Sequence, residues 1–438
     1  MIFHVASLGC ARNTVDSETM AGRLVAAGHE QTSDPAEAAV IIINTCSFIE
    51  PAINESIDTI LELAIYKQRG SCERIIVAGC LPERFREEIA TSLPEVDVFL
   101  GTGAYDRITE AITPQPKQSR CILPDPDALP GINDDQPRAL KPSPMVYLKI
   151  AEGCDRHCTY CIIPKLRGRQ KSRPIKTIVQ EATKLIQSGV KELVLVAQES
   201  SAYGKDLGLQ RGLSRLLEAL ASISSHVWIR VLYGHPDSLD DAMIRTMHAA
   251  DNICPYFDVP IQHISDRILK RMGRQYRQDD LLRLFDRIRS IADNACLRTT
   301  VIVGFPGETD TDFDVLYTGI EQIQFDHLGV FLYSDSEDLT AHRLRHHVPE
   351  KLARQRYDAV MSRQRDISAQ NNKKYLHQTL PVLIEENPEA GLYIGRTAFQ
   401  APEVDGLTFV HTKNLAIGKF ATVAITDTLA YDLTAEVR

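Results

Sequence analysis

Between residues 145 and 333, short apolar runs alternate with amphipathic helical patterns, and this alternation restricts the fold more than any other feature of the chain. Apolar runs of this kind are typical of strands buried in a parallel sheet, whose connections are usually helical. Eight strand-helix units close a complete barrel, so six units predict an incomplete (βα)6 barrel of the TIM type. The six predicted strands are residues 145–150, 192–197, 227–233, 256–259, 297–303 and 328–333.

The segments that flank this partial barrel have different patterns. Residues 1–112 contain apolar runs at 2–7, 40–44 and 75–78 and helical patterns at 15–27 and 51–64, which predict a doubly wound α/β domain. Residues 113–144 are rich in proline and lack periodicity, as is typical of a linker. The partial barrel and a charged helix at 349–374 make up residues 145–374. Residues 375–438 carry short runs at 380–385, 408–411, 420–427 and 432–437, which predict a small β-barrel.

Composition restricts the function classes that are open to this chain. The net charge of −9 argues against broad attraction to nucleic acid, because such binding depends on Lys and Arg that neutralise phosphates. No run approaches the roughly 20 apolar residues of a membrane span. The N-terminus lacks the pattern of a signal peptide, so we expect a cytoplasmic protein with no membrane partner. In that compartment, the ten cysteines are better interpreted as metal ligands, catalytic thiols or buried apolar residues than as disulfides.

Three cysteines, Cys154, Cys158 and Cys161, fall within eight residues directly after the first predicted barrel strand. A four-iron cluster takes four ligands, so three thiolates can hold it and leave one iron open to a small molecule. The alternative is a structural zinc site. Structural zinc normally has four protein ligands in two paired spacings, and no second pair lies nearby, so the sequence favours the cluster.

Polar and glycine residues follow other predicted barrel strands. Gln198 follows the second strand, and Gly304, Phe305, Pro306, Gly307 and Glu308 follow the fifth. Ligands of such barrels bind at the carboxyl ends of the strands, and glycines let the backbone approach a flat ring closely. Each signal alone is equally typical of an ordinary turn. Together they predict a cofactor site at this end of the barrel.

Three further cysteines share one position relative to the strands of the N-terminal domain. Cys10, Cys46 and Cys80 each lie just past a predicted strand. Because the carboxyl ends of neighbouring parallel strands meet at one crevice, we expect these thiols to be close in space and to hold a second cluster. The alternative is three unconnected buried cysteines. Asn13 and Asn44 flank the same crevice, and we expect their amides to donate to cluster sulfurs.

The CxxxCxxC spacing, with Tyr160 before the last cysteine, resembles the radical S-adenosylmethionine superfamily. The motifs at residues 7–18, 44–46, 79–80 and 149–168 resemble those of one family within it, the methylthiotransferases, and the last domain resembles a TRAM domain. This resemblance implies two four-iron clusters, one on each cysteine triplet. It also implies that S-adenosylmethionine binds at the open iron of the cluster held by Cys154, Cys158 and Cys161, in contact with Tyr160, Gln198 and residues 304–308.

Residues 393–397 and 401–406 resemble the family members that attach a methylthio group to the β-carbon of an aspartate in small-subunit ribosomal protein S-twelve. This likeness implies two molecules of S-adenosylmethionine per turnover, a reduced flavodoxin- or ferredoxin-type electron donor and a sulfide source. Charge gives an independent argument for the same target. Residues 376–438 contain eight acidic and four basic residues, a net charge of −4, which suits a basic ribosomal protein better than an RNA.

Two other functions compete with this interpretation. A tRNA adenosine methylthiotransferase would use the same two clusters, but a basic terminal barrel would be expected for an RNA target. A non-catalytic iron–sulfur or zinc scaffold that binds the ribosome is the second alternative. Release of 5′-deoxyadenosine from S-adenosylmethionine distinguishes an enzyme from such a scaffold.

Overall fold

The computed structural model describes residues 1–113, 119–128 and 137–438, and the chain folds into two compact units. The first unit contains Met1–Pro142, Lys149–His157 and Cys161–Arg173. The second unit contains Ser143–Leu148, Cys158–Tyr160 and Pro174–Arg438. Residues 114–118 and 129–136 of the predicted linker lie outside the described residues, and the domain limits expected from the sequence stay predictions.

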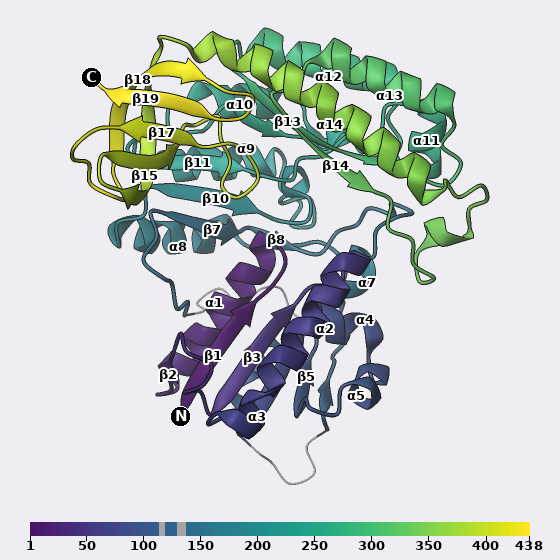
Figure 1. Ribbon diagram of the computed structural model, residues 1–438, viewed down its shortest axis with the longest axis vertical. Helices are drawn as coiled ribbons and strands as arrows, with labels where there is room; N and C mark the ends of the chain where they lie inside the picture. Colours follow the sequence, from purple (N-terminus) through teal and green to yellow (C-terminus); the bar gives the residue numbers. More distant parts are fainter. Residues whose placement is uncertain (114–118, 129–136) are drawn as a thin grey trace. The chain divides into compact units, whose positions relative to one another are not determined.

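The sheet of the first unit is parallel throughout and has the strand order β2-β1-β3-β4-β5-β6 (Figure 1). The three strands predicted from apolar runs at 2–7, 40–44 and 75–78 are confirmed as β1, β3 and β4, and β3 and β4 are buried along almost their whole length. The other three strands have two or three residues each, too few to give a pattern. The strands are β1 (Ile2–Ser7), β2 (Glu30–Gln31), β3 (Val40–Thr45), β4 (Arg74–Gly79), β5 (Val98–Leu100) and β6 (Cys121–Ile122).

Helices cover both faces of this sheet, which confirms the doubly wound prediction. Met20 and Leu24 of α1 (Ala11–Ala26) pack with Ile42 and Ile76 on one face. Ile60 of α2 (Glu50–Ala64) packs against the opposite face, with the alternate residues of β3 and β4. Helix α1 begins four residues before the predicted start, directly after Cys10. The shorter helices are α3 (Tyr66–Arg69), α4 (Cys80–Phe85), α5 (Glu88–Ser92) and α6 (Ile108–Ala111).

The first unit also contains a hairpin from the central part of the sequence. Strands β8 (Ala151–Glu152) and β9 (Lys171–Ser172) pair antiparallel, and α7 (Ile163–Arg167) lies between them in the sequence. The backbone of Gly153 passes so close to Arg169 that an added Cβ would lie 2.0 Å from the Arg169 carbonyl oxygen. Only glycine fits at this crossing.

The second unit contains the six predicted barrel strands as two three-stranded sheets, β7-β10-β11 and β12-β13-β14, joined by a bridge between Ile229 and Ile253. This confirms the partial barrel. The strands are β7 (Met145–Lys149), β10 (Glu192–Val196), β11 (Trp228–Val231), β12 (Tyr256–Asp258), β13 (Cys296–Val303) and β14 (His327–Leu332). The helices are α8 (Ile175–Gln187), α9 (Gly212–Ala221), α10 (Asp241–Ala249), α11 (Asp266–Arg271), α12 (Gln278–Ile291), α13 (Asp310–Ile323) and α14 (Glu350–Asn372). Within the described ranges, none of the helices has the length and apolar character that crossing a membrane requires.

The C-terminal strands close into a five-stranded barrel with the order β15-β16-β17-β19-β18 (Figure 1). Four of these strands were predicted from the sequence. The fifth, β16, was missed, because Gly395 interrupts its short apolar pattern, and an added Cβ at Gly395 would lie 2.3 Å from the Leu383 carbonyl oxygen. The strands are β15 (Thr379–Glu389), β16 (Leu392–Arg396), β17 (Thr408–His411), β18 (Phe420–Thr428) and β19 (Leu433–Val437).

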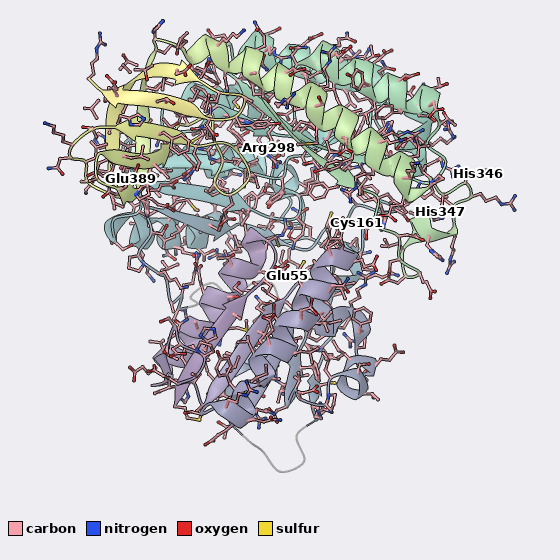
Figure 2. The ribbon with its side chains drawn as sticks, viewed as in Figure 1. Glu55, Cys161, Arg298, His346, His347 and Glu389 are labelled. Atoms are coloured by element: carbon pink, nitrogen blue, oxygen red, sulfur yellow. The ribbon has the colours of Figure 1, made fainter. Side chains whose placement is uncertain are left out.

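Buried charges fasten the C-terminal barrel to the partial barrel within the second unit. Glu192 accepts from Arg230 Nε at 2.7 Å and from Arg396 Nη2 at 2.6 Å, and all three side chains are at most 1% exposed. Tyr256 donates to Asp405 at 2.5 Å, and Arg298 Nε lies 3.5 Å from the same carboxylate (Arg298 is labelled in Figure 2). These ion pairs make the C-terminal barrel part of one folded unit with the partial barrel.

Replacing Glu192 with Gln should destabilise the second unit by roughly 3–5 kcal/mol, because it leaves two buried guanidiniums without their shared carboxylate. Urea unfolding followed by tryptophan fluorescence measures this, since the single tryptophan, Trp228, packs on Phe420 of the C-terminal barrel. The exposed Glu386→Gln is the matched control and should change stability by less than about 0.5 kcal/mol.

The same experiment has an expected pH dependence. Burial opposes ionisation of Glu192, but Arg230 and Arg396 outweigh it and lower the pKa of this carboxyl. A lowered pKa contributes stability above the usual glutamate pKa of about 4.3 and loses it as the pH falls through the folded value. The difference in free energy of unfolding between the natural chain and Glu192→Gln should therefore decrease below about pH 4. A difference that stays constant from pH 7 to pH 3 would contradict the lowered pKa of Glu192.

Candidate functional site

Cys10, Cys46 and Cys80 lie at the carboxyl ends of three adjacent parallel strands. Cys46 and Cys80 directly follow β3 and β4, and Cys10 follows β1 by three residues. The register pairs Ser7 with Asn44 and Thr45 with Gly79, so these strands end at the same edge of the sheet. The structure therefore brings the three predicted positions to one edge of the first unit.

Two glycines allow the cysteine loops to approach one another. Gly9 has a φ of +89°, and an added Cβ would lie 2.7 Å from Cys46 Cβ and 3.2 Å from Cys46 Sγ. Gly79 has a φ of +100°, and its added Cβ would lie 2.4 Å from Asn44 Oδ1. Side chains at these positions would force the loops apart, so both glycines are required for the close packing of the thiols.

Hydroxyl groups hold the backbone of the cysteine loops. The Ser56 hydroxyl donates to the Cys46 carbonyl at 2.8 Å and accepts from the Cys46 N–H at 3.2 Å. The Ser47 hydroxyl donates to the Cys80 carbonyl at 2.9 Å. Because these loops are fixed by side chains from neighbouring elements, the thiols are held in place by the fold itself.

The three thiols have different electrostatic surroundings. Burial raises the pKa of Cys46 to about 11, with the neighbouring Cys80 acting in the same direction. Burial also raises the pKa of Cys80, against the effect of Arg167. Burial acts in the same direction on Cys10, but Arg12, Arg167 and two backbone N–H groups outweigh it and lower the pKa of that thiol. Deprotonation of Cys46 and Cys80 therefore needs a further positive charge, such as bound iron.

The prediction that Asn13 and Asn44 donate to cluster sulfurs was wrong. Asn13 Nδ2 donates to the carbonyl oxygens of Leu8 at 2.9 Å and Thr45 at 3.0 Å. Asn44 Nδ2 donates to the Asn13 carbonyl and to the Ser17 hydroxyl, both at 2.9 Å. Buried carbonyl groups at the strand ends require donors, and these amides supply them. Their role is to connect the loops that carry the cysteines.

Sequence reasoning gave no role to Arg167, whose side chain contacts this site from α7. Its Nη2 lies 3.5 Å from Cys80 Sγ, and the side chain is 2% exposed. One signal in the sequence was Lys149, a single cation at the end of an apolar run. A buried cation requires buried acidic partners, and such partners can also bind a second cation such as Arg167. Lys149 and Arg167 both pair with Asp16.

Cys154, Cys158 and Cys161 lie on one loop between β8 and α7, and all three are half-buried (Cys161 is labelled in Figure 2). In the first unit, the Cys154 N–H donates to the Gly168 carbonyl at 3.0 Å, and Cys154 Sγ accepts from the Arg156 N–H at 3.5 Å. The spacing alone allows three thiolates to bind one cluster.

The part of this loop that belongs to the second unit is held by the turn after α11. Thr159 donates its N–H to Met272 O at 3.0 Å and its hydroxyl to Arg271 O at 2.8 Å. Tyr160 accepts from Arg274 at 2.6 Å, and its ring meets Phe305 edge to face with centroids 6.4 Å apart. Tyr160 therefore links the cysteine loop to the 304–308 loop within the second unit.

The 304–308 loop directly follows β13, as the cofactor prediction requires, but its glycines have structural partners of their own. Gly304 has a φ of +75°, and an added Cβ would lie 2.5 Å from Ala353 Cβ of α14. Gly307 has a φ of +85°, with its added Cβ 2.9 Å from the Arg271 guanidinium. Phe305 is fully buried among Ile268, Met272 and Ala341. These three residues shape the loop, and their contact with S-adenosylmethionine stays a prediction.

Glu308 points inward from the same loop. It accepts from Arg356 of α14 at 2.7 Å and from the Phe305 N–H at 3.2 Å, and His263 Nε2 lies 3.8 Å away. Burial outweighs Arg356 and raises the pKa of Glu308 to about 6, and burial lowers the pKa of His263 to about 3. His263 is therefore neutral at physiological pH, and Glu308 fixes the loop to α14.

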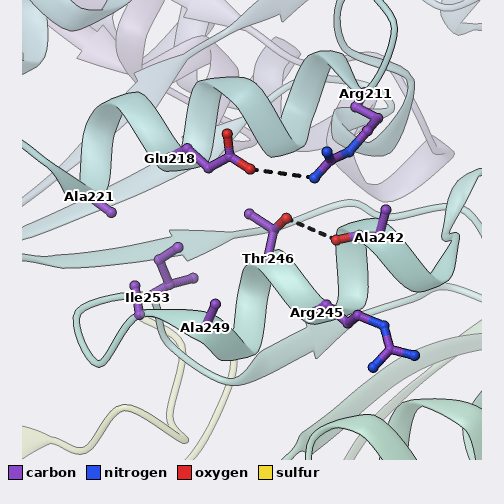
Figure 3. A pocket seen from close by; sticks show the side chains of 9 residues that line it. Arg211, Glu218, Ala221, Ala242, Arg245, Thr246, Ala249 and Ile253 are labelled. Carbon is purple, nitrogen blue, oxygen red and sulfur yellow. Dashed lines mark hydrogen bonds and ion pairs between the residues drawn. The ribbon is translucent and has the colours of Figure 1, made fainter.

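Gln198 lies two residues past β10 and is half-buried, at the end of the sheet where the prediction placed it. A separate pocket lies between α9 and α10, on the helical layer outside the strands (Figure 3). It contains none of the predicted site residues. Its walls are formed by Arg211, Glu218, Ala221, Ala242, Arg245, Thr246, Ala249, Ala250 and Ile253.

The donor set at Cys10, Cys46 and Cys80 fits a cluster better than a single metal ion. Within the described residues, no group of three or more His, Cys, Asp or Glu side chains has the arrangement that one ion requires. A four-iron cluster places each thiolate on a different iron, so its ligands need not converge on one point. The three thiols would supply three ligands of such a cluster, and the Arg167 guanidinium beside Cys80 would supply a hydrogen bond to sulfur.

Three family models match this chain in order. Residues 2–101 match the uncharacterized protein family UPF0004, residues 148–318 match the radical SAM superfamily, and residues 378–437 match the TRAM domain. Among solved structures, the radical S-adenosylmethionine methyltransferase TsrM from Kitasatospora setae has a TM-score of 0.56 at 14% identity, covering 76% of this chain and 74% of that one. That likeness concerns the fold alone.

Full-length relatives are much more similar in sequence. A protein of Desulfosudis oleivorans named ribosomal protein uS12 methylthiotransferase RimO is 54% identical over 440 residues, covering 100% of both chains. Its namesake in Clostridioides difficile is 47% identical over 98% of this chain and 97% of that protein. A third, in Geobacter sulfurreducens, is 44% identical over 99% of this chain and 98% of that protein.

Replacing Gly304 with Ala should destabilise the second unit by roughly 2–4 kcal/mol, because it combines a left-handed backbone with a clash against Ala353. Gly189→Ala is the matched control. Gly189 has a φ of +107° and nothing within 4 Å of an added Cβ, so only the backbone strain of about 1 kcal/mol remains. Thermal unfolding without S-adenosylmethionine measures both variants, and an equal loss in the two would contradict the packing role of Gly304.

Proposed function

The chain belongs to the RimO family of ribosomal protein uS12 methylthiotransferases, and on that premise we propose that it attaches a methylthio group to the β-carbon of an aspartate in uS12. The observation that carries this proposal is 54% identity over the whole length of a relative with that name. A match limited to the central domain would support only radical chemistry, since the same fold serves many reactions. Here the similarity to the 54% identical relative extends over all three matched segments of this chain.

The charge of the C-terminal barrel gives less support for the target than its composition suggests. Arg396 is buried and the Asp405 side chain is only 1% exposed, but their opposite charges cancel. Glu385 and Asp432 are half-buried, so the fully exposed residues of this barrel are five acidic and three basic, a net charge of −2 in place of −4 (Figure 2 labels Glu389). The choice of uS12 over tRNA therefore rests on the relatives and not on barrel charge. The exposed residues are Glu386, Glu389, Glu403, Asp427, Glu436, Lys413, Lys419 and Arg438.

We further propose that each cysteine triplet holds one four-iron cluster. When bound, the cluster held by Cys154, Cys158 and Cys161 would supply the electron that cleaves S-adenosylmethionine. The cluster held by Cys10, Cys46 and Cys80 would hold the sulfur to be transferred at its open iron. Tyr160, Gln198 and the 304–308 loop would line the S-adenosylmethionine site. The residues of the chain position these groups and exclude water from them.

The remaining partners follow from the chemistry. A single electron is needed for each cleavage, and we propose a reduced flavodoxin- or ferredoxin-type protein as its donor. Each product also takes up one sulfur atom, so a sulfide source is required. Because uS12 is a ribosomal protein, we place the reaction in the cytoplasm.

Replacing any one of Cys154, Cys158 and Cys161 with Ala should abolish release of 5′-deoxyadenosine, because a cluster left with two protein ligands loses the geometry that presents one open iron. Chromatography of the reduced, reconstituted chain with S-adenosylmethionine measures this release. Cys121→Ala, which alters a half-buried cysteine on edge strand β6, should retain it. Undiminished cleavage in any of the three ligand variants would refute this assignment.

Replacing Cys80 with Ala should preserve 5′-deoxyadenosine release and end methylthio transfer, because only the cluster on Cys10, Cys46 and Cys80 loses a ligand. Mass spectrometry of purified uS12 and of tRNA after incubation with each variant measures the transfer. The natural chain and Cys121→Ala should add one methylthio group to uS12 and none to tRNA. Modification of tRNA alone would overturn the proposed target, and full transfer by Cys80→Ala would overturn the proposed cluster on Cys10, Cys46 and Cys80.

A further inference from the structure

The Arg167 side chain lies among the residues that surround Cys80, all within the first unit. Its Nη2 donates to Asn13 Oδ1 at 2.6 Å and lies 3.5 Å from Cys80 Sγ. Its Nη1 donates to Asp16 Oδ2 at 2.7 Å and to Glu152 Oε2 at 3.3 Å. A single planar group thus binds two carboxylates on one side and directs its other nitrogen to an amide oxygen and a thiol sulfur.

The buried charges around Arg167 are balanced, which explains why it can stay ionised at 2% exposure. Lys149 binds Asp16 and donates to Glu152 at 2.7 Å, so two cations face two carboxylates. A buried charge is tolerated only when it is paired and hydrogen-bonded. Since the carboxylates fix the guanidinium from one side, the direction of its Nη2 toward Cys80 is set by the fold.

The segment that carries Arg167 also contacts Cys154, a member of the other cysteine triplet. The next residue, Gly168, accepts from the Cys154 N–H at 3.0 Å. Two consecutive residues therefore contact one predicted ligand of each cluster, Cys80 through the Arg167 side chain and Cys154 through the Gly168 carbonyl.

We propose that Arg167 is a positioning residue that sets the reduction potential of the cluster held by Cys10, Cys46 and Cys80. This inference rests on the proposed function, which places a cluster there. Hydrogen bonds to cluster sulfurs and nearby positive charge stabilise the more negative, reduced state. Arg167 supplies both to the sulfur of Cys80, so its presence raises the potential and makes this cluster easier to reduce.

The test uses the full-length chain with Cys154, Cys158 and Cys161 replaced by Ala, so that only the cluster of interest remains. Its midpoint potential is measured by redox titration with electron paramagnetic resonance detection, and bound iron and sulfide are counted. Arg167→Gln removes the charge and the fork of donors. Arg169→Gln is the matched control, because Arg169 lies two residues after Arg167, carries the same charge and has an exposed side chain.

Arg167→Gln should bind four irons and have a more negative midpoint potential, and Arg169→Gln should match the parent chain. An unchanged midpoint in Arg167→Gln would overturn the inference. If Arg167→Gln does not fold, Arg167→Lys decides: its ammonium keeps the charge beside Asp16 but cannot also reach Cys80, so the midpoint should fall by a smaller amount, and an unchanged value would overturn the inference. A parent chain that binds no cluster refutes the proposed function instead.

Discussion

The parallel pairing of β1, β3 and β4 is the constraint on which the site of the first unit depends. Ser7 pairs with Asn44, and Thr45 pairs with Gly79, so the three strands end together and the cysteines that follow them are brought to one edge. The register of β3 and β4 is strongly specified, because these two strands are buried on both faces and a slip of one residue would exchange those faces. Cysteines more than 30 residues apart in sequence thereby become neighbours without any local motif.

In both units, buried ion pairs connect segments that are far apart in the sequence. In the second unit, Glu192 joins Arg230 of the partial barrel to Arg396 of the C-terminal barrel. In the first, Asp16 joins Lys149 and Arg167, which come from the central part of the sequence, to α1. Such groups are expensive to bury, so each arrangement is stable only when every partner is present. They connect segments that belong to different matched families into single folded units.

Most of the fold could be predicted from the sequence, because periodicity and turn residues act locally. The three long strands of the first sheet, the six strands of the partial barrel and four of the five strands of the C-terminal barrel follow from apolar runs. The convergence of Cys10, Cys46 and Cys80 also follows, since it needs only strand ends. Burial of charged residues could not be predicted: Arg396 and Asp405 count as surface charges in the composition but are buried in the structure. Their opposite charges cancel, and it is the half-buried Glu385 and Asp432 that reduce the net charge of the fully exposed residues to −2.

The number of N–H donors on a side chain explains both why the expectation for Asn13 and Asn44 was incorrect and why Arg167 can contact Cys80. An asparagine amide has two N–H donors, and at a strand end the buried carbonyls and hydroxyls take both. A guanidinium has five donors in a rigid plane, so Arg167 satisfies Asp16, Glu152 and Asn13 and still has a donor near Cys80. At a crowded sheet edge, a side chain with donors to spare is therefore the one that can contact the cluster ligand.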